Sequence, residues 1–308
     1  MERLRDPTGA VTHPSSILGP VPTATLPDRR TDAPIPVDVP TPVVASPPGR
    51  PVPGPSVIDR LRGDASRRPV VDPGLAGGLR AWLEDGVAAI DGRLGDRVEP
   101  VVVDRRALEP GPWSGGGPIT ATVVRGAMVG ALFGQVVLTG QLGDPVGDGL
   151  AGLDARGRAD LVAFLRGLPG AERRALEQVV RRQATMMATQ WATVAPGWQP
   201  RVADRLTVPL AGGRVVLRGI ADLVLGTPSD GRASICLVDV RSGDPQPGHR
   251  RYRGFLALLE TVRSGAPPFR TATYYPASGD AQVDEVTDDL LAGAVDDVLR
   301  ALPAREAA

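Results

Sequence analysis

Two apolar segments in the C-terminal third of the chain each carry one aspartate, and they constrain the fold more than any other feature. The segment at 213–226, GRVVLRGIADLVLG, contains Asp222, and the segment at 233–240, ASICLVDV, contains Asp239. Both are rich in apolar and β-branched residues and are separated by the turn sequence TPSDGR, so they predict two antiparallel strands. A carboxylate on an apolar strand is costly unless a cation, a metal or hydrogen bonds satisfy it. The fold must therefore supply partners for both aspartates.

The rest of the chain divides into a helical first part and a mixed second part. Apolar residues at helical spacing predict helices at 75–90, 123–140, 156–168, 171–194, 249–265 and 283–302. Alternating or short apolar runs predict further strands at 101–103, 201–210 and 269–275. The order from 171 onward is helix, three-strand meander, helix, strand, helix, which predicts an α/β fold with a sheet flanked by helices.

Proline marks a separate N-terminal segment. Fourteen of the 32 prolines fall within the first 55 residues, and proline removes backbone donors and blocks helix formation. This composition predicts a disordered leader at 1–70, which acts either as a linker or as a ligand for a proline-binding protein partner. A single α/β domain at 71–308 follows, with a helical part at 71–200 and the core motifs at 201–302.

The composition excludes some classes of protein and of metal site but does not indicate one function. The net charge is zero, so no overall charge draws the chain to a nucleic acid or a membrane, although local basic patches remain compatible with it. All 35 basic residues are arginine, one cysteine excludes a disulfide framework, and two histidines are too few for a histidine metal cluster. We expect a cytoplasmic protein with no membrane partner, because the N-terminus lacks a signal-peptide pattern and no run of 18 or more apolar residues occurs.

The predicted hairpin can bring the side chains of Asp222 and Asp239 close together. If the hairpin is symmetric about Ser229–Asp230, Asp222 lies opposite Leu237, and Asp222, Asp239 and Arg241 project from one side of the sheet. Two converging carboxylates suit Mg²⁺ or Mn²⁺, and such an ion can activate water against a phosphodiester. The alternative is structural: Asp222 accepts hydrogen bonds at a strand end, and Asp239 forms a plain salt bridge with Arg241.

The run GIADLVL, CLVDVRSG, RYRGFLALLE and TATYY resembles the PD-(D/E)XK nuclease superfamily, in its RecB-like branch. That family has Gly-x-x-Asp on one strand, Asp-x-Lys-(Thr/Ser)-Gly on the next, and Gln-x-x-x-Tyr on a helix. The resemblance covers about residues 120–300 and is strongest at 214–276. It implies a restriction-endonuclease-like core, in agreement with the predicted order of elements.

Carried over residue by residue, the resemblance implies a role for each motif position. Asp222 and Asp239 stand at the metal ligands, with the Val240 carbonyl as a third, and Arg241 stands at the catalytic lysine. Three residues of the following helix are expected to contact nucleic acid: Arg251, Tyr252 and Arg253. Arg251 and Phe255 replace the motif glutamine and tyrosine. Weaker equivalents of other family positions are Gln135 or Glu177, for an upstream histidine, and Asp204, for an acid before the meander.

The resemblance therefore implies Mg²⁺- or Mn²⁺-dependent hydrolysis of DNA, and one substitution bears directly on it. Arginine is larger and planar and stays protonated, so Arg241 is no isosteric replacement for a catalytic lysine. We expect either a nuclease whose activity is weakened, or an inactive nuclease-like protein that binds nucleic acid or a protein partner. His249, just before the same helix, is expected to be a cap or a surface residue.

Overall fold

The structure is a computed structural model that describes residues 56–64, 68–94, 99–109, 118–191, 194, 196–227, 229 and 231–302. The predicted disordered leader lies outside the described residues over 1–55 and 65–67. The predicted domain start at 71 differs from the structure, in which helix α1 (Val57–Arg62) already belongs to the folded part. Val57 and Leu61 of α1 are buried in the core, which is why the folded part begins earlier.

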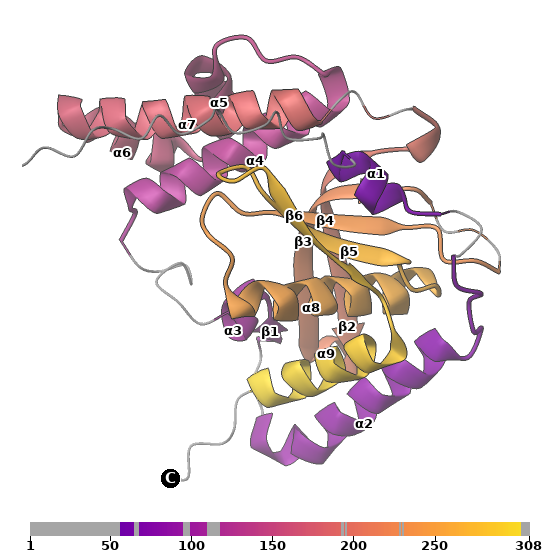
Figure 1. Ribbon diagram of the computed structural model, residues 1–308. Helices are drawn as coiled ribbons and strands as arrows, with labels where there is room; N and C mark the ends of the chain where they lie inside the picture. Colours follow the sequence, from indigo (N-terminus) through magenta and orange to yellow (C-terminus); the bar gives the residue numbers. More distant parts are fainter. Residues whose placement is uncertain are drawn as a thin grey trace, which may run out of the picture. The chain divides into compact units, whose positions relative to one another are not determined.

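The α/β class is confirmed by a mixed six-stranded sheet (Figure 1). Its strands are β1 (Val101–Val103), β2 (Arg201–Leu210), β3 (Val215–Leu225), β4 (Cys236–Val240), β5 (Arg270–Tyr275) and β6 (Asp280–Glu285). The order is β1-β3-β4-β5-β6, with β2 paired to β3 as well. β1 runs parallel to β3 and β4 runs parallel to β5, whereas the other neighbours are antiparallel.

Helices cover the sheet from two sides. The helices are α2 (Leu75–Leu94), α3 (Arg105–Leu108), α4 (Ala121–Thr139), α5 (Pro145–Ala155), α6 (Ala159–Gly167), α7 (Gly170–Gln190), α8 (Pro247–Ser264) and α9 (Asp288–Ala301). One hydrophobic cluster joins α4 and α7 to β4 and β5, and a second joins α2, α8 and α9 to β2 and β3. Figure 1 shows α4 and α7 on one side of the strands and α2, α8 and α9 on the other.

Two predicted helices differ from the structure, each for a local reason. The helix predicted at 156–168 corresponds to α6, which starts only at Ala159 because Gly157 adopts φ +69° just before it; helix α5, which ends at Ala155, was not predicted. The helix predicted from 283 starts only at α9, whose N-cap Thr287 accepts a hydrogen bond from the Leu290 amide. The residues before that cap form β6, which returns from β5 through a turn with Gly279 at φ +73°.

Helix α4 is the core helix of the α4–α7 side. It is long and apolar enough to cross a membrane by length and composition alone. Half of its apolar window is buried inside the protein, with Val124, Met128, Leu132 and Phe133 fully buried, whereas Leu138 near its end is exposed. This burial is compatible with a soluble protein.

Candidate functional site

The candidate site lies where two strands end against the same edge of β3. β2 pairs along one edge of β3 from Val215 to Val224, so β1 and β4 must share the other edge. β1 pairs with the first part of β3 and runs parallel to it, whereas β4 pairs with the last part and runs antiparallel. The carboxyl ends of β1 and β4 therefore point toward each other, and the residues that follow them meet.

Tyr252 of α8 fills the gap between these two strand ends. Its hydroxyl donates to the Ile220 carbonyl and accepts from the Ile220 amide, both at 3.1 Å. These are the backbone groups of β3 that neither β1 nor β4 reaches. The side chain is 3% exposed, so Tyr252, predicted to contact nucleic acid, completes the sheet edge instead.

The hairpin register differs from the predicted one by two residues. Val224, and not Asp222, lies opposite Leu237. A shift of two residues leaves each side chain on its predicted face, since side chains alternate with period two. Continuing the register one pair beyond Leu223–Val238 brings Asp222 opposite Asp239. The prediction that the two aspartates approach each other thus survives an incorrect register.

Asp222 occupies the point where β3 and β4 separate. Its Oδ2 accepts a hydrogen bond of 2.7 Å from the Val240 amide. Helix α4 comes close at Gly130, where an added Cβ would lie 3.9 Å from Asp222 Oδ1. Burial raises the pKa of Asp222, and the Val240 hydrogen bond and the charges of Arg105 and Arg156 oppose this rise. The carboxylate therefore has the strand-end hydrogen bond that the structural alternative requires.

Asp239 and Arg241 belong to a buried ion-pair network that also includes Glu109. Arg241 is 5% exposed and Asp239 is 2% exposed, and Arg241 Nε donates to Asp239 Oδ2. The two Nη atoms of Arg241 donate to the two carboxylate oxygens of Glu109, at 3.0 and 2.9 Å. Such a bidentate pair fixes both orientation and charge. The guanidinium group also lies 5.2 Å from the ring centroid of Tyr252.

Helix α3 provides the part of the network that the sequence analysis missed. Arg105 Nε donates to Glu109 Oε2 at 2.9 Å, and the Arg105 guanidinium lies 5.6 Å from the Tyr252 ring centroid. Both residues follow β1 in VVVDRRALE, so the signal in the sequence was a group of charged residues directly after a short apolar strand. Only the shared edge of β3 shows that they meet residues from the end of β4.

The carboxyl groups of the network are crowded. Burial raises the pKa of Asp239 well above its usual range, and the negative charges of Asp222 and Glu109 add to the rise. The guanidinium groups of Arg105 and Arg253 oppose it. Burial also raises the pKa of Glu109, against the lowering effect of Arg105. At all three acids the effect of burial is larger than the opposing effect of the arginine charges, so their pKa values stay raised.

Four of the carboxylate oxygens that could bind a divalent cation already have hydrogen-bond partners in this arrangement. Asp239 Oδ2 and both oxygens of Glu109 are bound by Arg241, and Asp222 Oδ2 is bound by the Val240 amide. No group of three or more His, Cys, Asp or Glu side chains in the described parts of the chain is placed to hold a metal ion. Arg241 places a positive charge between Asp239 and Glu109.

The other residues singled out from the sequence lie apart from this network or inside the core. Phe255 is a core residue, 1% exposed. Gln135 donates to Asp148, Glu177 pairs with Arg173, and Asp204 pairs with Arg201. None of the three is described in contact with Asp222 or Asp239.

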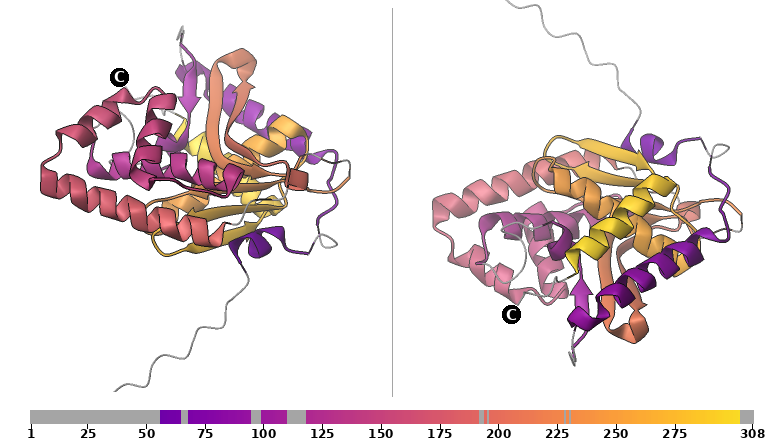
Figure 2. Two further views of the ribbon diagram at one scale, coloured as in Figure 1. Left: turned by 90° about the horizontal axis from the view of Figure 1, so that it is seen from above. Right: turned by 90° about the horizontal axis from the view of Figure 1, so that it is seen from below.

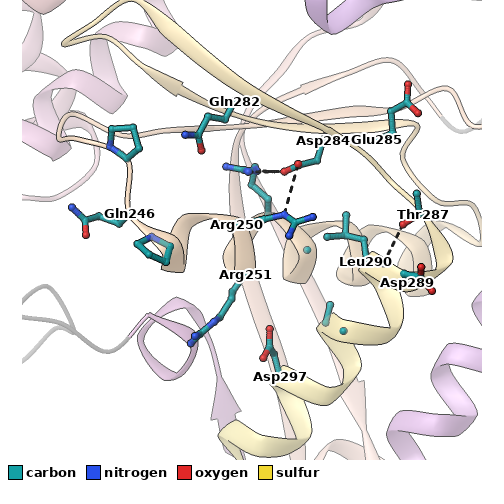
Figure 3. Close-up of a pocket in the computed structure, with 16 residues that line it drawn as sticks. Gln246, Arg250, Arg251, Gln282, Asp284, Glu285, Thr287, Asp289, Leu290 and Asp297 are labelled. Carbon is teal, nitrogen blue, oxygen red and sulfur yellow. Dashed lines mark hydrogen bonds and ion pairs between the residues drawn. The ribbon is translucent and has the colours of Figure 1, made fainter.

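Arg251 and Arg253 line a groove of about 950 Å³ between α8, α9 and β6 (Figure 3). Arg253 is 3% exposed and is bound to Asp284 Oδ2 at 2.5 Å and to Thr273 Oγ1 at 2.8 Å. It is therefore a structural cation, whereas Arg251 is exposed and forms no described ion pair. Neither Asp222 nor Asp239 lines this groove.

His249 caps α8 and makes stability depend on pH. Its Nδ1 accepts from the Gln246 amide at 3.2 Å and lies 3.0 Å from the Tyr275 hydroxyl oxygen. Burial, with the charges of Arg105 and Arg253, lowers the pKa of His249 from 6.5 to about 4. Between these two values the unfolded chain binds a proton that the folded chain does not. We therefore expect stability to fall by up to about 3 kcal/mol as pH drops from 7 to 4.

Urea unfolding across that pH range measures the effect. His249→Gln is the matched variant, because it keeps a polar side chain but cannot titrate there. Its stability should fall less steeply between pH 7 and 4 than that of the wild type. Equal slopes for the two proteins would show that His249 does not carry the dependence.

Comparisons with known proteins indicate neither a family nor a function for this chain. No family model and no curated protein matches the chain. Among the solved structures that match, one titled "Crystal structure of SSO0001" is 9% identical, with 73% of this chain and 86% of that chain covered. Its TM-score is 0.27, a likeness too low to carry an argument.

Proposed function

We propose that this chain is a divergent PD-(D/E)XK-like protein that binds nucleic acid and whose carboxylates are balanced by an internal arginine and not by a catalytic metal. The observation that carries the second part is the position of Arg241. A buried guanidinium binds Asp239 through Oδ2 and Glu109 through both carboxylate oxygens, so three of the four oxygens of these acids already have a cationic partner. Arginine also stays protonated, so it cannot take the role of a lysine that exchanges protons.

An arginine-rich surface next to the site supports nucleic-acid binding. Helices α3 and α8 contact each other. They carry the exposed residues Arg106, Arg250 and Arg251. Within the described part of the chain, Arg250 lies 3.8 Å from Asp284, and neither Arg106 nor Arg251 forms an ion pair. The first turn of α8 has no acidic residue, and the N-terminus of a helix carries partial positive charge. Phosphate groups would relieve this concentration of positive charge, and contacts to phosphate account for much of nucleic-acid affinity.

DNA binding and cleavage test the proposal together, with labelled single- and double-stranded DNA in Mg²⁺, in Mn²⁺ and in chelator. We expect salt-dependent binding by the wild type, and about tenfold weaker binding by Arg106→Glu/Arg251→Glu. The salt slope should become shallower by roughly two, because each arginine that no longer binds a phosphate lowers it by about one. Arg166→Glu/Arg174→Glu changes charge equally on the exposed surfaces of α6 and α7 and should bind as the wild type does.

Two results would overturn the proposal separately. Absence of DNA binding would remove the binding function. Metal-stimulated cleavage that disappears in Asp239→Asn would remove the claim that Arg241 replaces the metal.

The second of these results would support the other candidate, Mg²⁺-dependent hydrolysis of DNA. One observation favours it: three acids with raised pKa values, Asp222, Asp239 and Glu109, crowd one site. Arg241→Lys distinguishes the candidates, because lysine cannot bind Glu109 bidentately and Asp239 at once. Cleavage gained by this variant would show that the arginine blocks an otherwise competent site.

A further inference from the structure

One face of the sheet is covered by helices over only part of its area. In the part formed by the ends of β2 and β3, Leu206, Val208 and Leu217 face α8 and are buried. The alternate side chains point the other way, and apart from Val216, which is 9% exposed, they are exposed. We call this surface the open face; its exposed residues are Val102, Arg205, Thr207, Pro209, Arg218 and Ile220.

The helical layer ends at a defined point. Val202 and Leu223 are paired across β2 and β3 and pack in the cluster that contains α4 and α7. Beyond this pair, the regular alternation of side chains between the two faces of the sheet is interrupted at Ala203, which adopts φ +52°. Ala221 then packs in the opposite cluster with α8. Figure 2 shows the paired ends of β2 and β3 extending beyond α4 and α7. The open face continues the sheet surface that these two helices cover.

The open face combines apolar exposure with positive charge. Ile220 is 49% exposed and Val102 is 39% exposed. Arg205 lies opposite Ile220, and Arg218 lies opposite Thr207, so the two arginines are diagonal neighbours about 7–8 Å apart. In the described parts of the chain neither arginine forms an ion pair. Asp104, which borders the face, is engaged as the N-cap of α3 and accepts from the Arg106 amide.

We propose that the open face binds an acidic amphipathic helix of a partner protein. A helix there would continue the layer formed by α4 and α7 and would bury Ile220 and Val102. Two carboxylates four residues apart on a helix lie about 5–6 Å from each other at Cβ, and the long side chains of Arg205 and Arg218, which start about 7–8 Å apart, can reach both. The exposed apolar residues are aliphatic, so bases of a nucleic acid have no aromatic ring to stack on here.

This inference does not depend on the proposed function, and a designed peptide tests it. The probe is a labelled amphipathic peptide of about 18 residues, five helical turns, with leucine on one face and glutamate beside it. Its match has every glutamate replaced by lysine. We expect saturable binding of the glutamate peptide to the full chain by fluorescence anisotropy, and at least about tenfold weaker binding of the lysine peptide, or about 1.4 kcal/mol.

Reversing the charge of the open face should reverse the preference for the glutamate peptide over the lysine peptide. Arg205→Glu/Arg218→Glu should weaken the glutamate peptide about tenfold and strengthen the lysine peptide, whereas Arg166→Glu/Arg174→Glu should change neither. Ile220→Asp should weaken both peptides and provides a second test if the double variant does not fold. Circular dichroism establishes folding of each variant.

Three outcomes would overturn the inference. The first is equal affinity for the two peptides, or no saturable binding. The second is single-stranded DNA binding that the Arg205→Glu/Arg218→Glu variant abolishes, which would assign the face to nucleic acid. The third is self-association of the chain, seen by sedimentation and abolished by Ile220→Asp, which would assign it to a second copy.

Discussion

Replacing Arg241 with methionine is expected to lower the free energy of unfolding by about 3–5 kcal/mol at neutral pH. The substitution keeps much of the side-chain volume and leaves Asp239 and Glu109 buried without the cation that binds both. Burial already raises the pKa of each acid, so both should take up protons more readily in the variant. The loss should therefore shrink as pH falls toward 5, because a protonated acid no longer needs a countercharge.

Urea unfolding monitored by circular dichroism measures this loss, and two further variants interpret it. Arg251→Met makes the same change at an exposed arginine of α8 and should alter stability by no more than about 0.5 kcal/mol. Adding Asp239→Asn and Glu109→Gln to Arg241→Met removes the unpaired charges, so part of the loss should be recovered. If Arg241→Met is as stable as Arg251→Met, the buried ion-pair network does not depend on Arg241 for its stability.

Replacing Trp191 with alanine is expected to cost about 3–5 kcal/mol, the range for large aromatic residues in a packed core. Trp191 is 1% exposed and follows α7 directly. Its ring meets Phe133 of α4 edge-on at 4.7 Å between centroids and Tyr274 of β5 at 5.3 Å. One side chain thus joins two helices to the sheet, and alanine would leave a cavity among all three.

Trp82→Ala is the matched control for this prediction. Trp82 lies on α2 and is 42% exposed, so its loss should change stability by less than about 1 kcal/mol. Thermal or urea unfolding of both variants gives the comparison. A similar loss in the two proteins would contradict the packing role assigned to Trp191.

The local spacing of apolar residues was sufficient to predict most helices and strands. It failed at particular places where one element ends and the next begins. Helices α2, α4 and α8 and strands β2 to β5 were predicted because their periodicity is a property of neighbouring residues. The strand β6 was read as helix because Val283 and the acids after it also fit a helical pattern until Thr287 caps α9. Helix α1 was missed because its six residues follow a proline-rich segment, and burial against the core stabilises it.

Only the site residues from the C-terminal part of the chain were predicted. Asp222, Asp239 and Arg241 stand out because charged residues interrupt or end apolar strands. Tyr252 and Arg253 were assigned to a substrate because a helix pattern does not reveal that one side chain completes a sheet edge and the other binds Asp284. Arg251 alone of that group is exposed.

Patterns of neighbouring residues were enough to predict the α/β class, the positions of most helices and strands, and two aspartates that need partners. Tertiary structure alone decided which partners they have. Glu109 is 132 residues from Arg241 in the chain, and they meet because β1 and β4 end against one edge of β3. Periodicity depends on near neighbours in the chain, whereas an ion pair between distant segments depends on which strand ends the folded sheet places side by side.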